Sequence, residues 1–146
     1  MHLEQAVFER AITVFPEPHR HYLRNIWFFV AEGPSVYCRW KHFWEPQSNK
    51  TSDIIFLSRR SLYRGPRFYL RDFFHELGHA LLMHLDRPEL KDRNLRRKLE
   101  WQASNLGIEW RKAAGEAVAK IFEEFIPKLV VSVSEEKAPE ETSEAA

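Results

Sequence analysis

The spacing of apolar residues changes along the chain, and each change marks a different kind of element. From Leu3 to Val14 the apolar positions recur every three or four residues, which predicts a helix. Asn25 to Ala31, Val36 to Phe43 and Asp53 to Ser58 are rich in aromatic and β-branched residues and predict strands. Because the connections between these strands are short and polar, we expect them to form an antiparallel meander.

After the third strand the spacing becomes helical again. A helix is expected from about Tyr69 to Leu85. Two further helices, from Leu95 to Leu106 and from Ile108 to Ile126, are expected on either side of a break at Gly107, and Pro127 ends the second. The pattern therefore predicts an α+β fold, with a small antiparallel sheet of about three strands packed on one helix and further C-terminal helices.

Length and composition predict a single folded domain followed by a short tail. The chain has 146 residues, of which 44% are hydrophobic and 14% aromatic, so residues 1–133 can bury a substantial core. Residues 134–146 carry five Glu, one Lys and no aromatic residue, which predicts a disordered acidic tail. The whole chain has a formal charge of +1, so the preceding 133 residues carry +5.

The amino end, the apolar runs and the cysteine content limit the expected compartment and the possible metal ligands. The amino end does not resemble a signal peptide, and no apolar run is long enough to cross a bilayer, so we expect a cytoplasmic protein with no membrane partner. Cys38 is the single cysteine, which excludes an intramolecular disulfide framework and a thiolate metal cluster.

One motif carries the candidate chemistry. The sequence His75-Glu76-Leu77-Gly78-His79 lies in the predicted helix from Tyr69 to Leu85. Two histidines four positions apart on a helix lie one turn and about 40° from each other, so both rings can reach one zinc ion. Glu76 lies beside that line, where a carboxylate can act as a general base. Gly78 costs about 1 kcal/mol relative to Ala in a helix, which indicates close approach of another backbone.

A catalytic zinc usually has three protein ligands, so a third must come from elsewhere in the chain. No histidine follows His84, and on a straight helix His84 lies about 140° round from His79, which favours a packing or surface role. A downstream carboxylate remains, and the choice narrows to Glu100 and Glu116. Small neighbours would let the helix of Glu116 approach closely, whereas Glu100 has the surroundings of a helix surface.

A family resemblance adds to this interpretation. The predicted strand from Asp53 to Ser58, a basic connection and the run from Phe73 to His84 resemble the ImmA/IrrE-type zinc metallopeptidases. The stretch from Glu116 to Pro127 is similar to a later helix of that family, and a weaker similarity links the chain to ArdC-type antirestriction proteins.

The resemblance implies a zincin-like fold in which His75, His79 and Glu116 bind Zn²⁺ and Glu76 is the catalytic base. It also implies hydrolysis of peptide bonds in a cytoplasmic protein or peptide substrate, such as a regulator. We expect the strand from Asp53 to Ser58 to be an edge strand that binds an extended peptide. Asp72, one turn before His75, is a candidate hydrogen-bond acceptor for the ring of His75.

Two other function classes follow from different features. Basic stretches from Arg59 to Arg71 and from Arg87 to Lys98 favour a zincin-like protein associated with nucleic acid, of the antirestriction or DNA-repair type. A non-catalytic zinc-binding module is the third possibility, and it leaves Glu76 without a role. The sequence identifies neither the substrate nor the oligomeric state.

Overall fold

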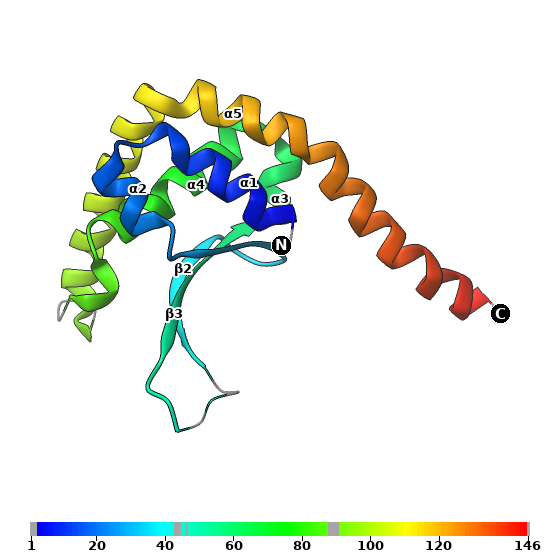
Figure 1. Ribbon diagram of the computed structural model, residues 1–146, viewed down its shortest axis with the longest axis horizontal. Coiled ribbons are helices and arrows are strands. Elements are labelled where there is room, and N and C mark those ends of the chain that lie inside the picture. Colours follow the sequence, from blue (N-terminus) through cyan, green and yellow to red (C-terminus); the bar gives the residue numbers. More distant parts are fainter. Residues whose placement is uncertain (1–2, 43–44, 46, 88–90, 146) are drawn as a thin grey trace.

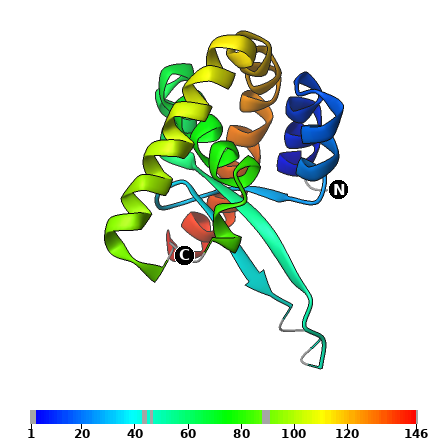
Figure 2. The ribbon, with the colours of Figure 1, turned by 90° about the vertical axis from the view of Figure 1, so that its left-hand side faces the viewer.

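The computed structural model describes residues 3–42, 45, 47–87 and 91–145, with side chains in the last helix described as far as Lys128. Helices gather on one side of a small sheet, and the far end of the β2–β3 hairpin projects away from them (Figures 1 and 2). The elements in chain order are α1 (Leu3–Ala11), η1 (Ile12–Val14), α2 (Glu17–Leu23), β1 (Trp27–Ala31), β2 (Val36–Lys41), β3 (Thr51–Ser58), α3 (Arg59–Arg64), α4 (Pro66–Leu81), η2 (His84–Asp86) and α5 (Arg93–Ala145).

The α+β class and the three strands are confirmed, with small shifts at the strand ends. Phe43, which the sequence placed in the second strand, lies outside the described residues. The predicted disordered tail, 134–146, lies beyond the described side chains, so it stays a prediction together with the domain boundary at residue 133. Among the described residues, none of the helices combines the length and the apolar character needed to cross a membrane.

The predicted antiparallel meander is wrong, because the strand order is β1-β3-β2. β1 pairs with β3 in parallel, with Trp27 opposite Ile54, and β2 pairs with β3 antiparallel, with Val36 opposite Phe56. Ile55 and Leu57 of β3 are fully buried. β3 therefore takes the central position, where it has a hydrogen-bonded neighbour on each side, and β1 and β2 become the edges.

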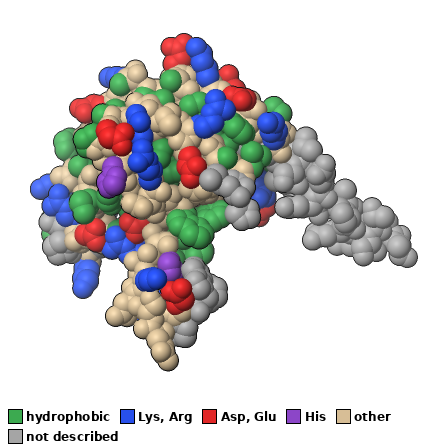
Figure 3. All heavy atoms as spheres, viewed as in Figure 1, with side chains coloured by type: hydrophobic (Ala, Val, Ile, Leu, Met, Phe, Trp, Pro, Cys, Tyr) green, Lys and Arg blue, Asp and Glu red, His purple; other side chains and the backbone are tan. Residues whose placement is uncertain are grey.

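The two faces of the sheet have different surroundings. Phe28 and Ile55 point into the main core, where the ring of Phe28 stacks on Phe8 of α1 at 5.2 Å and meets Phe73 of α4 at 6.0 Å. The opposite face carries a row of aromatic rings in contact, namely Trp27, Phe29, Phe56 and Trp40. In Figure 3, apolar side chains gather where the hairpin leaves the body, and charges of both signs are interspersed over the helices.

Two short helices were not predicted. Pro18 lies in the first turn of α2, where a proline needs no amide hydrogen and its fixed φ suits the start of a helix. α3 occupies the basic connection and is capped by Ser58, whose Oγ accepts from the amide of Ser61. Gly65, with φ of 109°, separates α3 from α4, since this left-handed conformation disfavours side chains with a Cβ.

Two glycines set the distance between α4 and α5. A Cβ atom on Gly78 would collide with the backbone of Ala103, as expected from the sequence. A Cβ on Gly107 would lie 2.8 Å from the carbonyl oxygen of Phe74 and 3.1 Å from the amide nitrogen of His75. The predicted break at Gly107 is therefore wrong, because this glycine is a packing contact in a continuous helix. α5 also continues through Pro127, which removes one amide donor without ending the helix.

We expect Gly107→Ala to destabilise the protein by about 1–3 kcal/mol, because the methyl group meets backbone atoms that cannot move independently. Gly115→Ala on the same helix is the matched control. Its Cβ would meet the flexible side chain of Arg111, so the gain in helix propensity, about 1 kcal/mol, should dominate. Urea unfolding of both variants measures the difference, and equal stability changes would contradict the packing role of Gly107.

Candidate metal centre

The two histidines of the motif lie on α4 as the sequence predicted. Their Nε2 atoms are 3.1 Å apart, and the two rings meet edge to face. The side chains are partly buried, with 25% of His75 and 13% of His79 exposed. Leu77 and Phe74 of the same helix are buried in the core, which fixes the rotation of α4 and turns both imidazoles toward α5.

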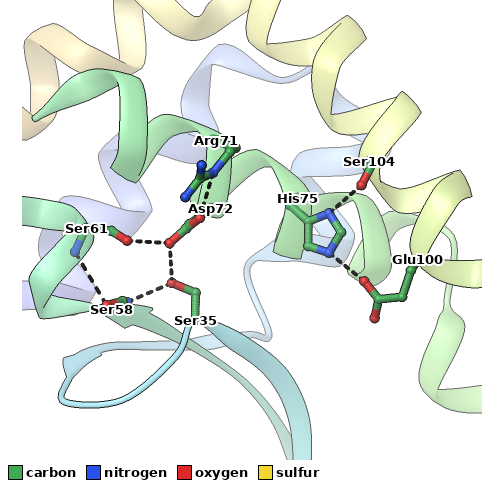
Figure 4. Close-up of polar contacts among 8 residues, drawn as sticks. All are labelled: Ser35, Ser58, Ser61, Arg71, Asp72, His75, Glu100 and Ser104. Carbon is green, nitrogen blue, oxygen red and sulfur yellow. Dashed lines mark hydrogen bonds and ion pairs between the residues drawn. The ribbon is translucent and has the colours of Figure 1, made fainter. Parts of the chain in front are cut away.

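Glu100 of α5 completes a group of three ligand atoms. Its Oε2 lies 2.8 Å from Nε2 of His75 and 3.2 Å from Nε2 of His79 (Figure 4 draws the contact with His75). Among the described residues, these three side chains form a group able to hold a metal ion. Glu100 is the most exposed of the three, so the group opens to solvent on the α5 side.

Glu116, which the sequence and the resemblance favoured as third ligand, is not brought to the histidines. It is exposed on α5, 16 residues after Glu100, which corresponds to about 24 Å along the axis and about 160° of rotation. Because α5 continues as one helix across Gly107, this separation along the helix allows only one of the two glutamates to lie beside the histidines. Glu100, the alternative weighed from the sequence, takes that place.

The donor set fits zinc in kind and in spacing. Two imidazole nitrogens and one carboxylate oxygen are a ligand set that catalytic zinc sites use. Tetrahedral zinc with bonds of about 2.0–2.1 Å separates its ligands by about 3.3–3.4 Å. The three separations here, 2.8, 3.1 and 3.2 Å, are close to that value. A small movement of the exposed Glu100 side chain would lengthen its 2.8 Å separation from His75 toward that value.

His84 makes a contact that the sequence did not predict. It was expected to pack or to lie on the surface, and it is buried, but its Nδ1 lies 2.8 Å from Nδ1 of His79. The expected helix to Leu85 ends instead at Leu81, and Met83 adopts a left-handed conformation with φ of 55°. This turn redirects the chain and brings His84 under His79. The sequence carries no glycine or asparagine here that would have indicated such a turn.

The outer partner of His75 is also different from the one expected. Oγ of Ser104 lies 3.0 Å from Nδ1 of His75, one turn along α5 from Glu100. Asp72 instead accepts hydrogen bonds from Ser61 at 2.6 Å and from Ser35 at 3.0 Å (Figure 4). Asp72 therefore ties α4 to α3 and to the start of β2, and the structure separates it from the ring of His75.

Glu76 lies in an environment that disfavours its charge. The side chain is buried, and burial raises its pKa to about 8, with the nearby carboxylates of Glu100 and Asp72 adding to the effect. A backbone hydrogen bond from Tyr37 of β2 acts in the opposite direction. Burial lowers the pKa of His79 to about 4. A cation held among these groups would restore the ionised form of Glu76.

These groups line one cavity of about 460 Å³ between the sheet, α4 and α5. Its described lining includes three carboxylates and three histidines but no lysine or arginine. Ser35, Ser58 and Ser61 form the part of the wall near Asp72, and Val36 and Tyr37 bring β2 to the rim. The cavity therefore joins the three ligand atoms, Glu76 and an edge strand of the sheet.

The pKa shifts predict how the stability of metal-free protein depends on pH. Folded Glu76 keeps its proton up to about pH 8, whereas unfolded Glu76 releases it near 4.5, so this group lowers stability as pH rises. His79 acts in the opposite direction between about pH 4 and 6.5. The contributions of Glu76 and His79 to the free energy of unfolding oppose each other below about pH 6.5. Above that pH only the contribution of Glu76 changes with pH.

We therefore expect the free energy of unfolding to fall between about pH 6.5 and 8, by at most about 1.4 kcal/mol per pH unit. Glu76→Gln removes the titrating group and should flatten this part of the curve. Urea unfolding in the presence of a chelator measures it, with the exposed Glu109→Gln as control. A Glu76→Gln curve as steep as that of the wild type would show that another group is responsible.

Comparison with protein-family models, with characterised proteins and with solved structures found no match to this chain. The resemblance to ImmA/IrrE-type metallopeptidases consequently stays a prediction that rests on the motif and its surroundings. The features of this chain that bear on its function are the three candidate ligand atoms, the buried Glu76 and the cavity that they line.

Proposed function

We propose that this protein is a zinc-dependent peptidase in which His75, His79 and Glu100 hold the ion and Glu76 is the general base. The observation that carries the proposal is the group of three ligand atoms beside a buried carboxylate in one open cavity. When bound, zinc supplies a Lewis acid and lowers the pKa of water. The chain's own residues supply the ligands, the base and the wall that receives the substrate.

Glu76 is suited to moving a proton during hydrolysis. It follows His75 directly and faces the same cavity, but it does not belong to the group of three ligand atoms. A carboxylate there can accept a proton from the attacking water and pass it to the leaving amine. Burial keeps competing solvent away from it, and the amide of Tyr37 holds its position against β2. A purely structural zinc site has no use for such a base.

The substrate is proposed to lie along β2. The sequence favoured β3 for this role, but β3 is the central strand and has no free edge. At the start of β1, the side chain of Gln5 already binds the carbonyl of Ile26 and the amide of Phe28, and no residue of β1 is among the described lining of the cavity. β2 is the remaining edge, and its residues Val36 and Tyr37 line the cavity. An extended peptide added there would pass beside Glu76 and the ligand atoms.

The ligand assignment predicts opposite results for two glutamates on the same helix. Loss of a residue that only hydrogen-bonds to a zinc ligand lowers affinity by about 10- to 100-fold. Glu100→Ala removes a ligand itself, so it should reduce zinc affinity by more than about 100-fold. Glu116→Ala is the control and should bind zinc like the wild type. Competition with a chromophoric chelator measures both. Strong binding by Glu100→Ala with loss in Glu116→Ala would reverse the assignment.

The mechanism predicts that Glu76→Gln keeps zinc and loses cleavage. General acid–base catalysis contributes about 10²- to 10⁴-fold, so peptide hydrolysis should fall by that factor while metal content stays at one ion per chain. Cleavage of a denatured-protein or peptide-library substrate, read by mass spectrometry, is the measurement.

Two outcomes of this assay would refute parts of the proposal. Zinc-loaded wild type without hydrolysis of any peptide would favour the non-catalytic zinc module. Unreduced cleavage by Glu76→Gln would remove its role as base.

In the same assay, peptides with N-methylated amides beside the scissile bond should resist cleavage, since strand addition to β2 needs those donors. Cleavage of such peptides at the normal rate would exclude binding along β2.

A further inference from the structure

We propose that His84 is a positioning residue that holds the ring of His79 in the tautomer and orientation needed to bind zinc. The inference rests on the proposed zinc site but concerns a residue that lies outside the group of three ligand atoms. His84 is 2% exposed, and its Nδ1 is 2.8 Å from Nδ1 of His79. The two rings meet at 69°, with centroids 5.1 Å apart.

The assignment follows from counting protons on the ring nitrogens. Nε2 of His79 faces His75 and Glu100, so it must be unprotonated to bind a metal ion. The proton of a neutral His79 is then on Nδ1, which donates toward His84. Nδ1 of His84 must accept, and the proton of a neutral His84 is consequently on its own Nε2. Each ring thereby fixes the tautomer of the other.

The backbone brings His84 to this position through a locally unfavourable conformation. If α4 continued beyond Leu81, His84 would lie about 140° round the helix from His79 and could not contact its Nδ1. Met83, at φ of 55° and ψ of 41°, turns the chain so that His84 begins the short helix η2. A non-glycine residue in the left-handed region is unfavourable unless the surrounding structure imposes it.

A salt-bridged connection links the sheet to the short helix that follows this turn. Asp86, at the end of η2, binds Arg39 of β2 at 2.7 Å, and Arg39 also binds Asp53 of β3 at 2.6 Å. The sheet is therefore connected to η2 through side chains, and η2 carries His84 to His79. Because Arg39 and Asp86 are partly exposed, this connection fixes position more than it adds stability.

His75 has an equivalent outer partner from the other side of the cavity. Oγ of Ser104 on α5 lies 3.0 Å from its Nδ1, which leaves Nε2 directed at Glu100. The two ligand histidines thus receive their outer partners from two separate elements, α5 and η2. Loss of the His84 contact should affect the ring of His79 and leave that of His75 in place.

The test is zinc affinity of the full chain, measured by chelator competition. His84→Leu fills similar volume without an acceptor and should weaken zinc binding by about 10- to 100-fold. His84→Asn can place its amide oxygen near the position of Nδ1 and should restore affinity to within about threefold of the wild type. His21→Leu, the same change at an exposed histidine of α2, is the matched control and should have no effect.

A spectroscopic measurement makes the proposal independent of whether His84→Leu folds. In the zinc-loaded wild type, long-range ¹H–¹⁵N spectra should show His79 protonated at Nδ1 and His84 protonated at Nε2. Asp86→Asn, an exposed change, should broaden the His84 resonances and weaken zinc binding by a smaller factor. A proton on Nδ1 of His84, or wild-type zinc affinity in folded His84→Leu, would overturn the proposal.

The results separate this inference from the peptidase proposal. If the wild type binds no zinc, the site itself is refuted and the role of His84 falls with it. If the wild type binds zinc through Glu100 and His84→Leu binds it equally well, the metal site stands and only the positioning role is refuted.

Discussion

The close approach of α4 and α5 is the contact on which the candidate site depends. Gly78, next to His79, faces the backbone of Ala103, and Gly107 faces the backbone of Phe74 and His75, so the two helices meet closely at two glycines near the candidate ligands. Without that spacing, a carboxylate on α5 could not lie 2.8 Å from an imidazole on α4. The ligand geometry is therefore a consequence of backbone packing, and Glu100 contributes only the oxygen.

This dependence explains which parts of the site could be predicted from sequence. His75, Glu76 and His79 lie within five residues on one helix, so the periodicity of the helix alone relates them. Glu100 comes from another element, and its identification needed the register between two helices. Gly107 indicated a break when only local propensity was considered, because a glycine in a helix costs stability. Its contact with α4 outweighs that cost, and the two predicted helices are one.

The same distinction applies to the sheet and to the turn after α4. Strand positions were predicted from local composition, but the order β1-β3-β2 depends on which strand can be buried on both sides, which is a property of the assembled core. His84 was excluded on the assumption of a straight helix. Met83 instead adopts a left-handed conformation that its side chain does not favour, and the segment after it is held to the sheet by Arg39 and Asp86, which are far apart in sequence.

The charges of the cavity connect packing to chemistry. Asp72, Glu76 and Glu100 line it without a described lysine or arginine, and Asp72 already has three hydrogen-bond or ion-pair partners in Ser35, Ser61 and Arg71. Among the described residues, no lysine or arginine lines the cavity beside Glu76, and burial of its charge there raises its pKa. An arrangement that only stabilised the fold would replace this carboxylate by an apolar residue at little cost. A divalent cation between His75, His79 and Glu100 would supply positive charge close to Glu76. The electrostatic strain of the metal-free cavity is thus the feature that a zinc site would relieve.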